Sequence, residues 1–525
     1  MAVPVTLAEA SPDAPALAPA PAERDAPTPA GIVLRDSHIG MLLAAALLLT
    51  YAAVIVTPYA VTDDWVNFAF AKMGQKVSVA AIPAGRVVDG ILVGYSFYWT
   101  PRLDDLRWLR LLGVLGIALL AWLLHRELVR AGWSRGRSAC LAYIMCVTPA
   151  FQVCAPWTTM WPVFFSAAWA GLACHASRKA MDAPGHLSRA SWVLGGAVLL
   201  FLSVTVYQVT MMFYVVFAAI DLYGQGSVAP RFWRRFIWHS GFLIGGLFIG
   251  WLAFKIGFHY YYFVSDPVRT KVQAEAWGDK LSWFWSWPLR DALQILKVRP
   301  SKHLPLLSAL FVFPGLFLFL RGALWQRALL LALAVVLIPV AYLPSLVANG
   351  RWDAYRTQMP MTALVLLYAF YALRGWARGV EFLLERAGRR SWRPRVASVT
   401  AAVLGLVAVG AAAAAAYNVT TIYAEPQMTE LRVLRREFKK VNWKTATKIN
   451  IVGATWSDSL AWSRYDEWGL ATSSRAWALP HIGYVMAYES LGGKRPKIPI
   501  AVVPRGFKPP PGEWVIDMSG LRSFK

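Results

Sequence analysis

Residues 39–65 read IGMLLAAALLLTYAAVIVTPYAVTDDW, a long apolar segment that ends near Thr57 and is followed by two adjacent carboxylates, Asp63 and Asp64. A helix over residues 39–57 is long enough to cross about 30 Å of hydrocarbon at roughly 1.5 Å per residue. Acidic residues so close to a membrane span are costly to keep unless they serve a function. Two interpretations stay open from this stretch alone: a functional acidic pair, or carboxylates that cap a helix in a solvated loop.

The composition indicates an integral membrane protein. Of the 525 residues, 57% are hydrophobic, whereas soluble domains contain about 45–50% apolar residues. The net charge of +24 would suggest nucleic-acid binding in a soluble protein. Here the Lys and Arg residues lie in short clusters between apolar segments, which is typical of membrane topology and lipid contact, so no nucleic acid is expected as a partner. The four cysteines have no disulfide or metal spacing and are expected to be small core residues.

The apolar segments predict a polytopic α-helical membrane protein with about eleven transmembrane helices. After residues 39–57 they lie at about 109–125, 138–152, 158–176, 191–206, 208–222, 239–257, 304–320, 328–347, 360–377 and 397–417. The short loops with dense Lys and Arg all fall on the same side as the N-terminal tail, which the positive-inside rule makes cytoplasmic. The other side holds the loops 58–108, 258–303 and 348–359 and everything after about residue 418.

Three regions follow from this reading. Residues 1–36 are rich in Ala and Pro and predict a disordered cytoplasmic tail. Residues 37–417 form the membrane module, whose large first outer loop at 58–108 is expected to contain helices lying along the membrane. Residues 418–525 predict a small extracytoplasmic α/β domain, with a basic amphipathic helix over 428–441 and short strands at 448–453, 498–503 and 514–517.

The outer loops carry the unusual polar residues. Arg351 and Arg356 lie in the short loop 348–359, against the positive-inside bias. Phosphate binding would explain them, because a guanidinium group binds phosphate through two parallel hydrogen bonds, and snorkelling to lipid headgroups would explain them equally well. The second acidic pair of loop 58–108, Asp104 and Asp105, lies among arginines and is expected to form a salt-bridged interfacial helix.

Other outer residues allow a functional and a structural interpretation alike. The loop 258–303 interleaves aromatic and polar side chains, including Tyr261, Arg269 and Lys271. These suit the faces and hydroxyls of a sugar, or an interfacial belt. Tyr207 and Gln208 lie at an outer turn between two predicted spans, where a hydrogen bond between helices is the alternative. The chain has no nucleotide-binding or metalloprotease motif, so the energy for any reaction must come from an activated substrate or a gradient.

Taken together, these features resemble the GT-C superfamily of polyprenyl-phosphate-sugar-dependent glycosyltransferases. The features are the acidic pair after the first span, Gly85-Arg86, Tyr207-Gln208 and the arginines of the late outer loop. The likeness is greatest to the Gtr-type O-antigen glucosyltransferases. Residues 465–470 (YDEWGL) and 476–480 (AWALP) are similar to the Glu-Phe-Gly and Trp-x-x-Pro pattern of those proteins, with Trp468 in place of Phe.

The resemblance implies an inverting enzyme on the periplasmic face of the bacterial inner membrane. It would move a hexose or pentose from a polyprenyl-phosphate donor, such as an undecaprenyl phosphate sugar, to a surface glycan such as the O-antigen of lipopolysaccharide. Asp63 or Asp64 would be the general base. Three arginines would hold the departing phosphate: Arg86, Arg351 and Arg356. The residues expected to contact the sugar or the acceptor are Trp65, Tyr207, Gln208, Tyr261, Arg269, Lys271 and Glu467.

The same resemblance implies membrane lipids, a flippase and a donor synthase as partners, and we predict no metal or other cofactor. A lipid-linked oligosaccharide transporter or flippase is the alternative from another class, and a polysaccharide polymerase or ligase is the alternative within enzymes. A transporter would carry charged residues inside its spans, and we expect the spans here to be nearly free of buried charge.

Overall fold

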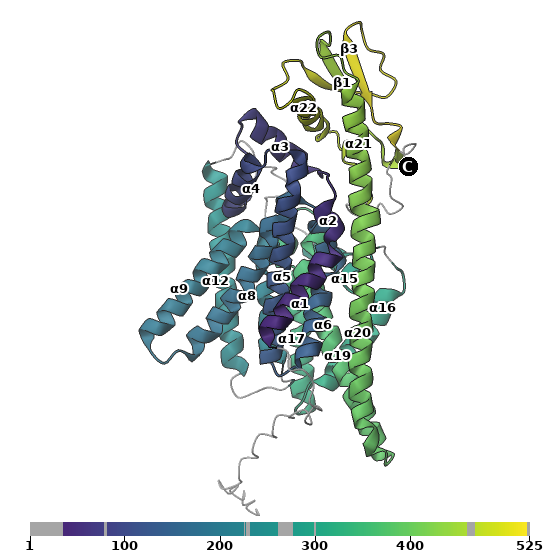
Figure 1. The fold of residues 1–525 in the computed structure, drawn as a ribbon. Helices are drawn as coiled ribbons and strands as arrows, with labels where there is room; N and C mark the ends of the chain where they lie inside the picture. The colour runs from purple at the N-terminus through teal and green to yellow at the C-terminus, as the bar shows by residue number, and fades with distance from the viewer. Residues whose placement is uncertain are drawn as a thin grey trace, which may run out of the picture.

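A computed structural model describes residues 35–77, 81–224, 226, 232–260, 277–298, 301–458 and 468–521. These residues form a helical bundle with a small sheet domain beyond one end (Figure 1). The bundle contains α1 (Asp36–Thr50), α2 (Ala52–Val56), α5 (Leu106–Arg130), α6 (Arg135–Cys146), α7 (Pro149–Cys154), α8 (Trp161–Asp182), α9 (His186–Val206), α10 (Gln208–Met211), α11 (Phe213–Tyr223), α12 (Phe232–Tyr260), α16 (Leu304–Phe319), α17 (Leu324–Ala341), α18 (Leu343–Val347), α19 (Met359–Arg386) and α20 (Arg393–Tyr417).

Shorter elements lie between these helices. They are α3 (Asp63–Met73), α4 (Val87–Trp99), η2 (Leu103–Asp105), η3 (Thr158–Met160), α14 (Trp277–Ser286), α15 (Pro288–Ala292), η5 (Tyr355–Thr357) and η6 (Arg390–Trp392). Helices α3 and α4 confirm that the first outer loop contains helices. We call the end of the bundle that carries them the α3/α4 end.

Each of the eleven predicted apolar segments coincides with a helix or with two short consecutive helices. Five helical segments of the described residues are long and apolar enough to cross a membrane, and three shorter apolar helices accompany them. The polytopic helical membrane protein is therefore confirmed, and the count of eleven spans stays a prediction. The five long segments are Leu103–Arg130, His186–Val206, Phe232–Gly257, Leu324–Ala341 and Arg390–Lys439.

Large apolar side chains also cover the outer surface of the bundle. Ile244 and Phe248 of α12 are 66% and 60% exposed, and Leu406 of α20 is 73% exposed. A soluble protein rarely exposes so much contiguous apolar surface, whereas hydrocarbon is a suitable neighbour for it. Helices α5, α8, α11 and α19 contribute the largest groups of residues to the bundle core.

Helix α20 continues without a break into the C-terminal region. The π-helical segment η7 (Asn418–Ala424) joins it to α21 (Glu425–Lys439), and Figure 1 shows this helix running along the bundle and on to the sheet domain. The boundary expected at 417/418 therefore falls inside one helix. The basic amphipathic helix predicted over 428–441 is α21.

The C-terminal region is a three-stranded parallel sheet with helices beside it. Strand β1 (Lys448–Val452) lies between β2 (Ile500–Val503) and β3 (Glu513–Asp517), with Ile451 opposite Val502 on one side and Ile516 on the other. Parallel strands need a crossover connection, and α22 (Leu479–Ser490), between β1 and β2 in the chain, packs on both of them. The three predicted strands and the α/β domain are confirmed.

The first outer loop and the C-terminal region share one hydrophobic core. Trp65 and Phe68 of α3 and Phe97 of α4 belong to the same buried cluster as Leu434 of α21 and Ile482 of α22. A charged contact joins the same two parts.

Asp104 Oδ1 accepts a hydrogen bond from Arg435 Nη2 at 2.9 Å. Of the second acidic pair, Asp104 is thus ion-paired, with the C-terminal domain rather than with the neighbouring arginines that were expected. The loop assigned to the membrane module packs as a layer of the C-terminal domain.

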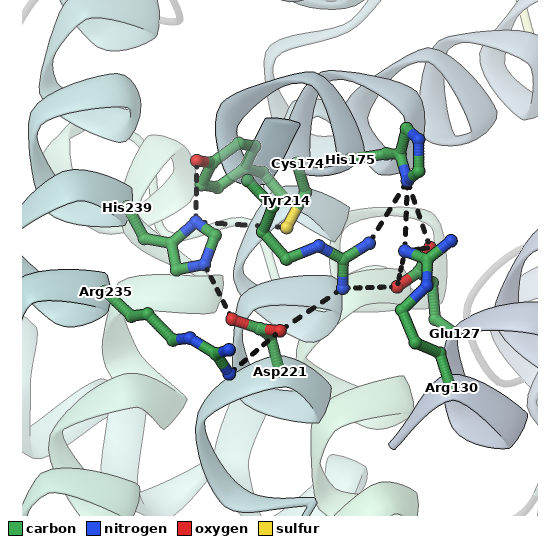
Figure 2. A network of polar contacts seen from close by, with 9 residues as sticks. Glu127, Arg130, Cys174, His175, Tyr214, Asp221, Arg235 and His239 are labelled. Carbon is green, nitrogen blue, oxygen red and sulfur yellow. Dashed lines mark hydrogen bonds and ion pairs between the residues drawn. The ribbon is translucent and has the colours of Figure 1, made fainter. Parts of the chain in front are cut away.

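The expectation that the spans are nearly free of buried charge is wrong for two of them, because Arg110 within 109–125 is 1% exposed and the side chain of Asp221 within 208–222 is 8% exposed. Glu127 of α5, Arg178 of α8 and Asp221 of α11 have side chains only 8–10% exposed, and they form a polar network with neighbouring helices (Figure 2). The charges were missed because they pair with one another across helices, which allows them to be buried.

Candidate active site

Asp64 ties the start of α3 to the bundle. Its carboxylate accepts backbone N–H bonds from Val61 at 3.2 Å, from Thr158 at 3.3 Å and from Thr159 at 3.0 Å. The side chain is fully buried. Burial raises the pKa of Asp64 to about 6, against the opposing effects of Arg110 and of these N–H groups. With both oxygens engaged by the backbone, Asp64 has the geometry of a positioning residue.

Arg110 of α5 completes this buried cluster. It is 1% exposed and donates to the carbonyl oxygens of Val54 at 2.7 Å and Tyr59 at 3.0 Å. Its guanidinium carbon also lies 4.1 Å from the centre of the Tyr59 ring. The chain between α2 and α3 is thereby fixed from both sides, because Arg110 holds its carbonyl groups and Asp64 binds N–H groups.

Asp63 differs from its neighbour in being half-buried. It interacts electrostatically with Asp89, which lies in the first turn of α4. Burial raises the pKa of Asp89 to about 7, the Asp63 carboxylate adds to this rise, and the Arg86 guanidinium opposes it. Asp89 Oδ1 is buried with no hydrogen-bond partner among the described residues. Two interacting carboxylates that share a site can hold one proton between them near neutral pH.

Arg86 brings the first outer loop to the junction of α9 and α10. Its Nε donates to Gln208 Oε1 at 3.3 Å, and its guanidinium carbon lies 4.5 Å from the centre of the Tyr207 ring. Gln208 Nε2 donates in turn to the carbonyl oxygen of Ala84 at 2.8 Å. The structure thus places together three residues that the sequence put far apart.

Arg356, from η5, approaches the same place from the late outer loop. Its guanidinium carbon lies 4.9 Å from the Trp157 ring and 5.3 Å from the Trp352 ring. Burial raises the pKa of Tyr207, while Arg86 and Arg356 both act to lower it. Tyr207 is therefore within electrostatic range of both guanidinium groups, which gives two fixed positive charges beside one aromatic ring.

Arg351 lies apart from this pair. Its side chain is 52% exposed, and Nη2 is 3.9 Å from a carboxylate oxygen of the exposed Asp279. The loop that carries it is held by Lys280 of α14, which donates to the carbonyl oxygens of Ala348 at 2.9 Å and Gly350 at 2.6 Å. Burial, with the nearby Arg351 charge, lowers the pKa of Lys280 to about 8.

The C-terminal domain reaches the residue before the acidic pair. Thr62 has φ 34°, a left-handed conformation that costs a non-glycine residue about 1–3 kcal/mol. Its N–H donates to Thr472 Oγ1 at 3.4 Å. Thr472 is held in turn by Glu430 of α21, whose carboxylate accepts the N–H groups of Thr472 at 2.8 Å and Ser473 at 2.6 Å.

The remaining candidate residues have no place in this site. Trp65 is 1% exposed and its indole N–H donates to the Ala60 carbonyl at 3.1 Å, so the structure shows it as a packing residue and its contact with a sugar stays a prediction. Tyr261, Arg269, Lys271 and Glu467 lie outside the described residues. Sequence reasoning missed Asp89 and Lys280; Asp89 could have been found as the one charged residue in the apolar stretch 87–99.

The site thus offers two interacting carboxylates, Asp63 and Asp89, with Arg86 acting on Asp89 and with both Arg86 and Arg356 acting on Tyr207. Such a set can accept a proton from a hydroxyl group and stabilise an anionic leaving group. No group of three or more His, Cys, Asp or Glu residues with metal-binding geometry occurs in the described part of the chain.

Comparisons with known proteins identify no family. No family model matches the sequence, and no curated protein matches it. Among solved structures, the crystal structure of ArnT from Cupriavidus metallidurans in the apo state is similar at a TM-score of 0.41 and 12% identity, over 84% of each chain. A likeness of this size does not establish a shared fold or activity.

Proposed function

We propose that this membrane protein is a glycosyltransferase that takes its sugar from a polyprenyl-phosphate donor. One observation supports this most: the half-buried carboxylate pair lies beside Arg86, which joins Gln208 and Tyr207, with Arg356 in electrostatic range of the same tyrosine. A glycosyl phosphate donor needs both functions at once, because a hydroxyl must lose a proton while a phosphate departs with its charge.

In the proposed reaction, the oxygen of an acceptor hydroxyl forms a bond to the anomeric carbon of the donor sugar. The bond between that carbon and the phosphate oxygen breaks, the hydroxyl proton passes to Asp63, and the anomeric configuration inverts. Arg86 and Arg356 hold the departing polyprenyl phosphate, and Arg351 is a less central candidate at the exposed loop. Asp89 holds a proton beside Asp63, and Asp64 positions helix α3.

The finer assignments are proposals of the same kind. The sequence resemblance and the basic loops favour a bacterial inner membrane, with the α3/α4 end in the periplasm and a surface glycan such as O-antigen as acceptor. A flippase and a donor synthase would then supply the lipid-linked sugar. We propose no metal or other cofactor.

The first experiment compares purified wild-type protein with Asp63→Asn and Asp64→Asn, using a panel of polyprenyl-phosphate hexoses and pentoses. Loss of the general base should lower turnover by about 10²–10⁴-fold with donor binding retained, and we expect this for Asp63→Asn. Asp105→Asn is the matched control, because Asp105 is a half-buried carboxylate of the same loop.

The proposal fails if wild-type protein releases sugar from no donor, or if Asp63→Asn and the control turn over equally fast. Transport of a lipid-linked oligosaccharide in proteoliposomes, unaffected by Asp63→Asn, would instead support the transporter alternative.

A further inference from the structure

A second polar site lies at the opposite end of the bundle. Helix α5 begins next to η2 at the α3/α4 end and ends at Arg130, and a cavity of about 290 Å³ opens beside this last turn. Its volume is near the lower end of the ~300–1,000 Å³ typical of small-molecule sites. The lining residues come from α5, α8, α11 and α12 and the adjoining turns: Glu127, Arg130, Ala131, His175, Arg178, Lys179, Asp182, Asp221, Gly224 and Arg235.

Two buried carboxylates hold the arginines of this cavity in place (Figure 2). Glu127 binds Arg178 Nη1 at 2.6 Å and Arg130 Nη1 at 2.9 Å. Asp221 binds Arg178 Nη1 at 3.3 Å and lies 3.5 Å from Arg235 Nη1. Arg178 binds both carboxylates and lies at the centre of the network. Arg130 and Arg235 each bind one carboxylate through a single nitrogen, Nη1, and their other N–H groups can bind a ligand.

Two histidines also take part in this network. His175 Nδ1 faces the guanidinium nitrogens of Arg130 at 3.0 Å and Arg178 at 3.2 Å. The same nitrogen lies 3.8 Å from Glu127 Oε1, so His175 belongs to the cluster that holds these arginines. His239 is used internally, between Asp221 at 3.3 Å and the Tyr214 hydroxyl at 3.0 Å.

The cavity keeps an excess of positive charge. Four cationic side chains against three carboxylates leave a net charge of 4 − 3 = +1 on its lining. Arg130 and Arg235 are 41% and 33% exposed, and Arg235 Nε is buried without a hydrogen-bond partner among the described residues. Lys179 is exposed at the rim. Exposed guanidinium and ammonium donors around a positively charged cavity indicate an anion with several acceptor oxygens, such as a phosphate.

The surroundings of the cavity indicate that this phosphate belongs to a lipid. Trp192 on α9 packs edge-on against His175, with 6.4 Å between the ring centres, and is 40% exposed. Trp233 on α12 is 47% exposed. Exposed tryptophans beside apolar helix surfaces mark the headgroup level of a membrane. Leu194 and Ile237, each 67% exposed, continue that surface along the same two helices.

We propose that this cavity binds the phosphate of an anionic phospholipid in the leaflet opposite the candidate active site. Arg130, Lys179 and Arg235 would contact the phosphate oxygens, while Glu127 and Asp221 keep the guanidinium groups oriented. Basic pockets between transmembrane helices are known to bind such headgroups. The proposal does not rest on glycosyl transfer, and its test needs no sugar donor.

The test uses full-length protein in detergent and measures the shift in melting temperature on titration with phosphatidylglycerol, phosphatidylcholine or inorganic phosphate. The variants are Lys179→Glu and the double variant Arg130→Gln, Lys179→Glu, which leave Arg178 and its carboxylates in place. Arg390→Glu is the control, because Arg390 is a cation with an 81% exposed side chain that does not line the cavity.

We expect phosphatidylglycerol, but not phosphatidylcholine, to stabilise the wild type and the control. The double variant should bind it at least about tenfold more weakly, since a hydrogen bond to a charged group contributes about 1.5–3 kcal/mol. Equal phosphatidylglycerol affinity in wild type and double variant would overturn the proposal. The proposal would also be overturned if inorganic phosphate raised the melting temperature as much as phosphatidylglycerol does at the same concentration, because the ligand would then be a free anion. Each shift is referred to the lipid-free melting temperature of the same variant, so a loss of stability is not mistaken for a loss of binding.

Discussion

Replacing Asp64 with alanine should destabilise the protein more than the same change at Asp63. Asp64 accepts three backbone N–H bonds, from Val61, Thr158 and Thr159. Each buried donor left without an acceptor costs about 1–3 kcal/mol, so the loss in unfolding free energy is at least about 3 kcal/mol. Asp63 is half-buried and interacts electrostatically with Asp89, and its removal relieves a repulsion between two carboxylates, so the loss of stability should be smaller than for Asp64.

The assay is thermal unfolding of both variants in the same detergent, at one scan rate because unfolding of such a protein is commonly irreversible. A domain of about 150–250 residues loses roughly 2–4 °C per kcal/mol, and this longer chain loses less per kcal/mol. We therefore expect Asp64→Ala to melt at least a few degrees below wild type, and also below Asp63→Ala. The division of roles is refuted if Asp64→Ala melts like wild type, or if Asp63→Ala is the unstable variant and keeps its turnover.

Three further predictions concern the same end of the bundle. Arg86→Lys keeps the charge but loses the Nε bond to Gln208 and the flat contact with Tyr207, so KM for the donor should rise about tenfold; an unchanged KM would contradict a role in phosphate binding. Asp89 has a folded-state pKa of about 7, above its ordinary value, so its contribution to stability is complete below about pH 4 and is lost as pH rises through 7. Melting curves should show a smaller fall between pH 4 and 8 in Asp89→Asn than in wild type, and parallel falls would contradict the shift. Glu430→Ala leaves the N–H groups of Thr472 and Ser473 without their acceptor at a cost of roughly 2 kcal/mol or more, and limited proteolysis should cut the C-terminal domain faster than in Glu430→Gln, which retains one acceptor.

The elements of the fold could be predicted because their signals are local. Apolar runs mark the helices of the bundle, and the strands of residues 448–452, 500–503 and 513–517 stand out as short β-branched runs between turns. The hydrogen bond between Arg86 and Gln208 was not predicted, although both residues were expected on the same side of the membrane.

The pairing of side chains across helices could not be read from the sequence. Nothing in the order of residues shows that Asp64, rather than Asp63, is bound by Thr158 and Thr159. The network around Arg178 was hidden for a similar reason, because its members look like ordinary residues of basic loops. Asp221, the one charged residue in the apolar run of α11, was the signal that could have revealed it.

The position of Asp63 depends on the C-terminal domain as much as on the bundle. Thr62 adopts a left-handed conformation, and such a residue persists only where its surroundings over-determine the backbone. Here Asp64 fixes the chain from the bundle side and Thr472 contacts it from the C-terminal side. Because α20, η7 and α21 form one helix, the domain that carries Thr472 cannot tilt without bending that helix or breaking the shared core with α3. A partner or acceptor that moved the C-terminal domain would therefore also move Thr62, and through it the carboxylate proposed to be the base.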